Sequence, residues 1–436
     1  MNFWEKLLAY LFAILMLPFA AALYLLMLNS QSAGGNLTAS VESAVIKSQA
    51  APAVVEEAPP KKLANPPSII NAVYVTGWSA GSSKYFKYLS NLFLTTEINA
   101  VVVDIKDYTG LVSYNSQAPE VKKYGLTDGA IKDINALVKF FHDQNIYAIG
   151  RISVFEDPAY SKVRPDLAVQ DKGGGLWLDN HKLSWMDPAA KEVWDYNISL
   201  AKDAFLHGFD EINFDYVRFP SDGKTENMEL SFWDGKTPRH VVISNFFKYV
   251  RENLPDEKLS ADLFGLATVN NDDLGIGQKL EDTFNNFDYV SPMVYPSHYA
   301  KNFIGFFNPA DHPYEVIKYS MDKAMQKQAA FQKAQAQLAL EQGKMINVSP
   351  DLTANSSAPL AQSQAADLFV DDSEVKTKFR PWIQDFNMGA IYTSDMVKKE
   401  IQAVKDALGE NYAGIMLWNP SNIYTQEAVL KPKPMQ

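Results

Sequence analysis

From residue 69 onward, short runs of apolar and β-branched residues alternate with longer stretches that have the periodicity of amphipathic helices. Strands are predicted at residues 72–76, 100–105, 146–152, 211–214, 259–263, 289–294, 379–383 and 414–417. Helices are predicted between them at residues 82–95, 129–144, 189–207, 238–253, 315–341 and 394–408. This alternation is typical of an α/β fold, and it predicts a closed (β/α)8 TIM barrel rather than an open doubly wound sheet.

The N-terminal segment has a different pattern, because residues 7–28 form an almost unbroken apolar run that polar residues follow. A membrane-spanning helix needs about 20 apolar residues, whereas the apolar core of a cleaved signal peptide has about 7–15. Residues 1–29 are therefore predicted to be a transmembrane anchor that holds the barrel outside the cytoplasm, as in a single-pass protein of the cell membrane. The alternative is a signal segment that is cleaved to give a secreted protein.

Two further segments lack the β–α pattern. Residues 30–67 are rich in Ala, Ser, Pro, Val and Glu without sustained periodicity, so they are predicted to be a flexible linker. The barrel is then predicted over residues 68–428. Within it, a Ser-, Ala-, Asn- and Gln-rich stretch near residues 343–372 is predicted to be an insertion between the sixth and seventh repeats.

Composition narrows the chemistry. Hydrophobic residues make up 47% of the chain, which is enough for a large core, and the formal net charge is −11. No long basic run is present, so nucleic acid is not a predicted partner. The absence of cysteine excludes disulfides, thiolate catalysis and cysteine-ligated zinc, and the six histidines do not form a zinc-peptidase motif. Neither a metal nor another cofactor is predicted.

Polar residues end several predicted strands, and the carboxyl ends of the strands form the active site of a TIM barrel. Hydrolysis of a glycosidic bond needs two carboxyl groups, one as acid and one as nucleophile or base. Asp215 is the strongest candidate, because no helix begins directly after it and helix capping does not explain it. Asp262 is the next candidate and is favoured as the proton donor, with Asp385 second.

Other residues at the same strand ends are predicted to bind the sugar. Charged side chains would hold it by hydrogen bonds, and aromatic rings would stack on its flat faces. These residues are Asp104, Lys106, Arg151, Arg218, Tyr295, Trp382 and Trp418. A structural ion-pair cluster explains Asp104 and Lys106 equally well.

A competing motif lies at residues 77–81, where Gly-Trp-Ser-Ala-Gly matches the Gly-x-Ser-x-Gly nucleophile elbow of serine hydrolases. Ser79 would be the nucleophile, and Asp262 and His298 could complete a triad in the required chain order. The motif follows the first strand of the domain, whereas the elbow normally follows several earlier strands. A turn of small residues is therefore the favoured interpretation.

The segment at residues 210–220, Asp-Glu-Ile-Asn-Phe-Asp-Tyr-Val-Arg-Phe-Pro, resembles the signature of a bacterial family of glycoside-hydrolase-like domains that was first defined as a domain of unknown function. The blocks that agree with the same family lie at residues 72–78, 103–107, 260–265, 291–299 and 380–386. The resemblance covers nearly everything from about residue 69 to residue 424. It implies a (β/α)8 barrel related to the α-glycosidases, in which the Asp that ends the fourth strand is the nucleophile.

This resemblance assigns the nucleophile to Asp215 but does not assign the acid. Asp262 stands on the fifth strand, where starch-type enzymes carry Glu, and the sixth strand has no carboxylate. We therefore expect a glycoside hydrolase that acts on a cell-surface or extracellular polysaccharide. The alternatives are a catalytically inactive carbohydrate-binding barrel at the cell envelope, a structural envelope protein and a serine hydrolase.

Overall fold

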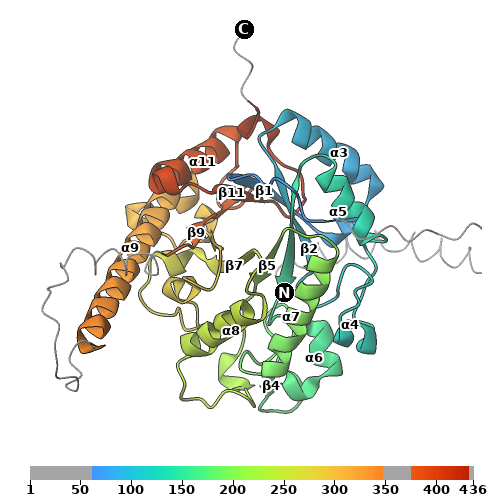
Figure 1. Cartoon of the computed structure of the whole chain (residues 1–436), viewed down its shortest axis with the longest axis vertical. Helices are drawn as coiled ribbons and strands as arrows, with labels where there is room; N and C mark the ends of the chain where they lie inside the picture. The colour runs from blue at the N-terminus through green and yellow to red at the C-terminus, as the bar shows by residue number, and fades with distance from the viewer. Residues whose placement is uncertain (1–60, 347–374, 432–436) are drawn as a thin grey trace, which may run out of the picture. The chain divides into compact units, whose positions relative to one another are not determined.

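The computed structural model describes residues 61–346 and 375–431, and these residues form a closed barrel of parallel strands surrounded by helices (Figure 1). Its strands are β1 (Ile70–Val75), β2 (Ala100–Lys106), β3 (Tyr147–Ser153), β5 (Glu211–Asp215), β7 (Leu259–Phe264), β8 (Tyr289–Met293), β9 (Lys378–Phe379), β10 (Trp382–Gln384) and β11 (Gly414–Trp418). β1 pairs with both β2 and β11, and β10 pairs with both β11 and β8, which closes the ring. The predicted (β/α)8 architecture is confirmed.

The seventh position of the barrel differs from the prediction of one strand at residues 379–383. It is divided into β9 and β10, which are separated by Arg380 and Pro381. Proline has no N–H to donate to a strand ladder, so the pairing is interrupted there. β9 pairs with β8, and β10 continues the ring by pairing with β11.

The predicted helices are found in the predicted order as α3 (Ser83–Thr95), α5 (Ile134–His142), α7 (Lys191–Leu206), α8 (Arg239–Asn253), α9 (Pro313–Ile346) and α11 (Ser394–Leu408). Three short helices were not predicted: α2 (Gly77–Ala80), α4 (Pro119–Tyr124) and α6 (Pro158–Val163). α5 begins later than the predicted residue 129, because Asp133 caps it by accepting a hydrogen bond of 2.9 Å from Ala136 N. The pattern did not predict the short antiparallel ribbon of β4 (Gln170–Asp171) and β6 (Met228–Glu229).

Within a single strand, alternate residues face either the core between barrel and helices or the interior of the barrel. In β5, Ile212 and Phe214 belong to the core between barrel and helices, while Glu211, Asn213 and Asp215 occupy the alternate positions. All five residues of this strand are buried. Successive strand residues point to opposite faces, so the three polar side chains point into the barrel. The fold thereby places polar groups in a buried interior.

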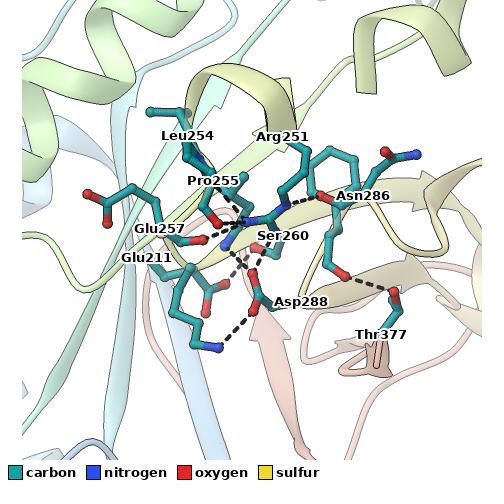
Figure 2. A network of polar contacts seen from close by, with 12 residues as sticks. Glu211, Arg251, Leu254, Pro255, Glu257, Ser260, Asn286, Asp288 and Thr377 are labelled. Atoms are coloured by element: carbon teal, nitrogen blue, oxygen red, sulfur yellow. Dashed lines mark hydrogen bonds and ion pairs between the residues drawn. The ribbon is translucent and has the colours of Figure 1, made fainter. Parts of the chain in front are cut away.

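Contacts between charged side chains and backbone carbonyls fasten the opposite end of the barrel (Figure 2). Arg251, in the last turn of α8, donates hydrogen bonds to the carbonyls of Glu257 at 3.0 Å and Asn286 at 2.8 Å. It also pairs with Asp288 at 2.8 Å, and Lys258 reaches the same carboxylate at 2.7 Å. Lys258 directly precedes β7 and Asp288 directly precedes β8, so the network fixes the starts of two strands whose far ends carry site residues.

Several predictions fall wholly or partly outside the described residues. The anchor at residues 1–29 lies outside them, as do most of the linker at residues 30–67 and most of the insertion near residues 343–372. The last part of the predicted linker is described, and it packs on the barrel, because Leu63 N donates to Asp210 Oδ1 at 2.6 Å. Among residues 61–346 and 375–431, no helix is both long and apolar enough to span a bilayer.

Candidate active site

A cavity of about 890 Å³ opens where the strands end. Its lining combines carboxyl groups, two guanidinium groups and aromatic rings. The residues that line it are Tyr108, Arg151, Glu156, Asp179, His181, Leu183, Trp185, Asp215, Tyr216, Arg218, Asp222, Asp262, Phe264, Gly265, Leu266, Gln278, Met293, Tyr295, His298, Tyr299, Trp382 and Trp418. The position agrees with the active-site end of a TIM barrel.

Arg151 of β3 is the centre of the charged floor. Its Nη1 pairs with Asp104 of β2 at 2.5 Å, its Nη2 pairs with Asp215 of β5, and its Nε lies 3.8 Å from Asp262 of β7. The parallel register brings these groups together, because Asp104 is aligned with Arg151 and Ser153 is aligned with Asp215. One guanidinium therefore faces three buried carboxyl groups and cannot balance the charge of all three.

The Asp262 carboxyl responds to this excess of negative charge. Burial, and then the charge of Asp215, raise its pKa well above the usual value, although Arg151 and a hydrogen bond from Asn213 oppose the shift. Asn213 Nδ2 donates to Oδ1 at 2.8 Å. The proton on the Asp262 carboxyl is therefore held more tightly than on an ordinary carboxyl, and Arg151 forms an ion pair with Asp215. Acid–base sites typically place two carboxyl groups in environments that give them different pKa values.

The backbone after Asp215 is strained. Tyr216 has a φ of +54°, in the left-handed region that non-glycine residues rarely adopt. In this conformation the Tyr216 N–H donates to Asp215 Oδ1 at 2.6 Å. Such strain costs about 1–3 kcal/mol and is concentrated at functional sites. Here it aims a backbone donor at the candidate catalytic carboxylate.

A second charged group lines the cavity on the segment that follows β3. Burial raises the pKa of Glu156 to about 8, even though the positive charge of Arg218 lowers it. The Arg218 guanidinium lies over the ring of Trp185 at 4.6 Å and over that of Phe264 at 5.0 Å. The sequence did not predict Glu156, because the candidates after the third strand extended only to Ser153 and Glu156 lies three positions beyond it. The feature of the sequence that could have identified Glu156 is its position in the segment that follows the third strand.

The aromatic rings on one side of the cavity come from the last strands of the barrel and the segment after β8. Tyr295 and Trp418 lie 5.8 Å apart, centroid to centroid, and Trp418 also lies 6.1 Å from Tyr74. Trp418 is half-buried and keeps part of its ring free for a sugar. Trp382 is only 1% exposed and packs edge-on against Tyr74 at 6.4 Å, so it shapes the floor and offers little surface for stacking.

The structure brings most of the predicted site residues into one cavity. The predicted residues that line it are Arg151, Asp215, Arg218, Asp262, Tyr295, Trp382 and Trp418. Asp104 lies behind Arg151, where it also accepts a hydrogen bond from the Tyr74 hydroxyl. It therefore holds Arg151 in place and does not itself line the cavity.

Two predicted residues lie away from the cavity, which corrects their assignment. Lys106 is fully buried and pairs with Asp157 at 2.7 Å, so its ammonium group cannot reach a ligand in the cavity. Asp385 accepts hydrogen bonds from Thr425 N at 2.7 Å and Thr425 Oγ1 at 2.6 Å. Burial raises the pKa of Asp385 to about 6, but this carboxyl serves to hold the chain that follows β11.

The Gly-x-Ser-x-Gly motif has a packing role in the described structure. A Cβ on Gly77 would lie 2.1 Å from Ser113 Oγ, and one on Gly81 would lie 1.9 Å from the carbonyl oxygen of Ala130. Both glycines therefore let α2 approach the chain that follows β2. Ser79 lies within α2 and its N–H donates to Thr76, and it does not line the cavity that holds Asp262 and His298. The triad required of a serine hydrolase is thus not assembled in the part of the chain that the structure describes.

No group of three or more His, Asp or Glu residues that could hold a metal ion occurs within the described ranges 61–346 and 375–431.

A closed parallel barrel with paired carboxyl groups and aromatic rings at its carboxyl end defines a TIM-barrel protein with a site of the glycosidase type. The family model with the description "Putative glycosyl hydrolase domain" matches residues 72–338 and 345–424. The chain belongs to this family, which confirms the resemblance seen in the sequence. No curated protein matches the chain in sequence.

Solved structures with a similar chain come from several bacteria. A hypothetical protein from Ruminiclostridium thermocellum ATCC 27405 is 43% identical, with 47% of this chain and 98% of that chain covered and a TM-score of 0.41. α-L-Fucosidase isoenzyme 2 from Paenibacillus thiaminolyticus is 12% identical, with 83% and 48% covered and a TM-score of 0.47. The α-galactosidase of Thermus thermophilus in complex with stachyose is 11% identical, with 83% and 64% covered and a TM-score of 0.43. This chain spans less than two-thirds of the length of these two enzymes.

Proposed function

We propose that the barrel is a glycoside hydrolase that cleaves glycosidic bonds of a cell-surface or extracellular polysaccharide. The observation that carries the proposal is the arrangement of Asp215 and Asp262 on neighbouring strands, where both border one cavity and share Arg151. Asp215 has a guanidinium partner, while burial and the charge of Asp215 raise the pKa of the Asp262 carboxyl. Membership of the family supports the same function.

In this proposal Asp215 acts at the anomeric carbon. Its carboxylate is held by Arg151 and by the N–H of Tyr216, so it does not need to reorganise when positive charge develops on the sugar ring. Arg218, which also lines the cavity, donates hydrogen bonds to sugar hydroxyls, and Tyr295 and Trp418 pack against the ring. A carboxyl group in its protonated form completes the site by protonating the leaving oxygen.

Replacement of the proposed nucleophile tests the function. Asp215→Asn should lower the release of reducing sugar from a panel of bacterial and plant polysaccharides by at least about 10³-fold, because the amide cannot take the role of the carboxylate. Reducing ends would be measured for the domain from residue 61 onward, with circular dichroism as the check on folding. Asp256→Asn, at an exposed carboxylate far from the cavity, is the matched control and should keep full activity.

Undiminished turnover by a folded Asp215→Asn protein would contradict the assignment of the nucleophile. If the wild-type domain binds a glycan but releases no reducing sugar, and Asp215→Asn binds it equally well, the barrel is a carbohydrate-binding protein and the proposed activity is wrong.

We also propose that residues 7–28 anchor the protein in the cell membrane as a single span, with the barrel on the extracytoplasmic side. The length of the apolar run supports an uncleaved anchor over a signal segment. This location would bring the cavity to glycans outside the cytoplasm, which no cytoplasmic barrel could reach.

A further inference from the structure

We propose that Glu156 is the carboxyl group that protonates the leaving glycosidic oxygen, and that Asp262 is a positioning residue beneath Asp215. This inference rests on the proposed hydrolase function and goes beyond it by naming the proton donor. The sequence had favoured Asp262 for that role.

Access to the cavity separates the two candidates. Asp262 Oδ1 is occupied by Asn213, and its Oδ2 is sealed from solvent without a hydrogen-bond partner in the described structure. The Glu156 side chain also lines the cavity, and within the described residues its carboxyl oxygens have no hydrogen-bond partner and are not among the sealed atoms. A proton donor must contact the oxygen that it protonates. The Glu156 carboxyl is open to a ligand in the cavity, whereas the free oxygen of Asp262 is sealed.

The backbone around Glu156 is held firmly, although its carboxyl is free. Ser153 Oγ donates to the Glu156 carbonyl at 2.9 Å, and Glu156 forms an antiparallel bridge with Trp185. The next residue, Asp157, caps α6 and pairs with the buried Lys106. These contacts fix the position of the Glu156 Cα, so its side chain projects from a rigid segment into the cavity.

The strand order places Glu156 and Asp262 on opposite sides of Asp215. β5 carries Asp215 and lies between β3, which leads to Glu156, and β7, which carries Asp262. Charged groups from the neighbouring segments act on Glu156. Asp215 ends β5 and Arg218 follows it, Asp179 lies in the loop before α7, and Arg151 lies on β3. Burial and the two carboxylates outweigh the two guanidinium groups, so Glu156 is protonated at neutral pH with a pKa of about 8.

The chemical step then balances. The bond between the anomeric carbon and the leaving oxygen breaks, its electron pair stays on that oxygen, and the oxygen takes the proton of the Glu156 carboxyl. The anomeric carbon gains a bond to a carboxylate oxygen of Asp215, or to a water oxygen whose proton passes to Asp215. In the first case Glu156, now ionised, takes a proton from the attacking water, the bond from the anomeric carbon to Asp215 breaks, and its electron pair returns to the Asp215 carboxylate. In the second case Asp215 releases its proton to solvent and Glu156 takes one from solvent, so both routes restore the starting state.

Leaving-group dependence tests the assignment. For the sugar that the polysaccharide screen identifies, phenyl and 2,4-dinitrophenyl glycosides would be compared, because the dinitrophenolate leaves without help from an acid. Glu156→Gln should lower kcat/KM for the phenyl glycoside by about 10²–10⁴-fold and for the dinitrophenyl glycoside by less than about tenfold. It should also abolish the loss of wild-type activity as the pH rises through about 8. Asp262→Asn is the matched variant, and it should affect both substrates equally.

Equal losses on both substrates in Glu156→Gln, or a leaving-group-dependent loss in Asp262→Asn, would overturn the inference while the hydrolase function stands. If the wild-type protein cleaves neither glycoside nor any polysaccharide of the panel, the proposed function and this inference fail together.

A measurement of stability gives a readout that needs no substrate. The folded protein raises the Glu156 pKa from its ordinary 4.5 to about 8, so the folded state binds this proton more tightly than the unfolded state. The stabilisation is complete below the unfolded pKa and is lost as the pH rises toward about 8. The melting temperature of the wild type should therefore fall relative to Glu156→Gln between about pH 4 and about pH 9. A constant difference would show that Glu156 is not held protonated.

Discussion

Asp104 shows how one buried residue can serve a site that it does not touch. Its two carboxyl oxygens are occupied by Arg151 and by the hydroxyl of Tyr74, and it is 2% exposed. Arg151 in turn orients Asp215. The side chain therefore acts through a chain of contacts, and its effect on activity should appear in the rate of the reaction more than in the affinity for the substrate.

Asp104→Asn should lower kcat by at least about tenfold with little change in KM, because the Arg151 guanidinium loses the partner that orients it. It should also lower the free energy of unfolding by about 1–3 kcal/mol, because the hydrogen bonds from Arg151 and Tyr74 lose their charged acceptor while Arg151 keeps Asp215 as a partner. Steady-state kinetics and urea denaturation would measure both effects. Tyr74→Phe is the control, since it keeps the pair between Asp104 and Arg151 and should cost only about 1 kcal/mol. A rise in KM with unchanged kcat would contradict the positioning role.

At the scale of the element, the short helix α2 shows why a motif needs its surroundings. The five residues of Gly77–Gly81 match a nucleophile elbow, but their glycines are explained by close approach to Ser113 and Ala130. Sequence spacing cannot distinguish a glycine that frees a catalytic turn from one that lets two segments pack. The tertiary neighbours decide between them.

Gly81→Ala should destabilise the fold by about 1–3 kcal/mol, because its Cβ would overlap the backbone carbonyl of Ala130, which cannot move as a side chain can. Ser79→Ala should leave both stability and hydrolysis nearly unchanged. Thermal unfolding and the reducing-sugar assay would be applied to both variants. Loss of activity in a stable Ser79→Ala protein, or labelling of Ser79 by a fluorophosphonate, would restore the serine-hydrolase hypothesis.

The strands are the elements that the sequence predicted best. β2 is buried at every position, and its near-continuous apolar run is typical of a central strand in a parallel sheet. The division between β9 and β10 was not predicted, because residues 379–383 contain a proline that weakens the strand pattern but does not show where the chain rejoins the sheet. The short ribbon of β4 and β6 escaped prediction for a similar reason, since each of its strands is only two residues long.

At the scale of the whole molecule, closure of the barrel creates the site. Arg151, Asp215 and Asp262 come from three strands, and their side chains meet only because β3, β5 and β7 are neighbours in the ring. At the opposite end, Arg251 and Asp288 fasten the starts of β7 and β8 (Figure 2). Stability and chemistry are thus located at opposite ends of the same strands, which is the general arrangement in TIM barrels.

The proposed anchor makes a prediction for the full-length protein. When it is expressed from residue 1 in a bacterial host, it should remain in the membrane fraction after carbonate extraction, and its barrel should be digested by protease added to spheroplasts. Deletion of residues 1–29 should release the protein to the soluble fraction. A full-length product that appears in the medium without its first residues would show a cleaved signal segment, and protection from protease would contradict the extracytoplasmic position.

The sequence alone determined the barrel, its order of strands and helices, and the candidate nucleophile Asp215. The elements follow from periodicity and Asp215 from its place at a strand end, which are local properties of the chain, and the resemblance to the family implied its role as nucleophile. The tertiary structure decided which charged groups share the cavity. It removed Lys106 and Asp385 from the site, because Asp157 and Thr425 hold their polar groups elsewhere. It added Glu156, whose raised pKa arises from burial among groups that are distant in sequence. Proximity and burial are properties of packing, so no pattern within a single segment could reveal them.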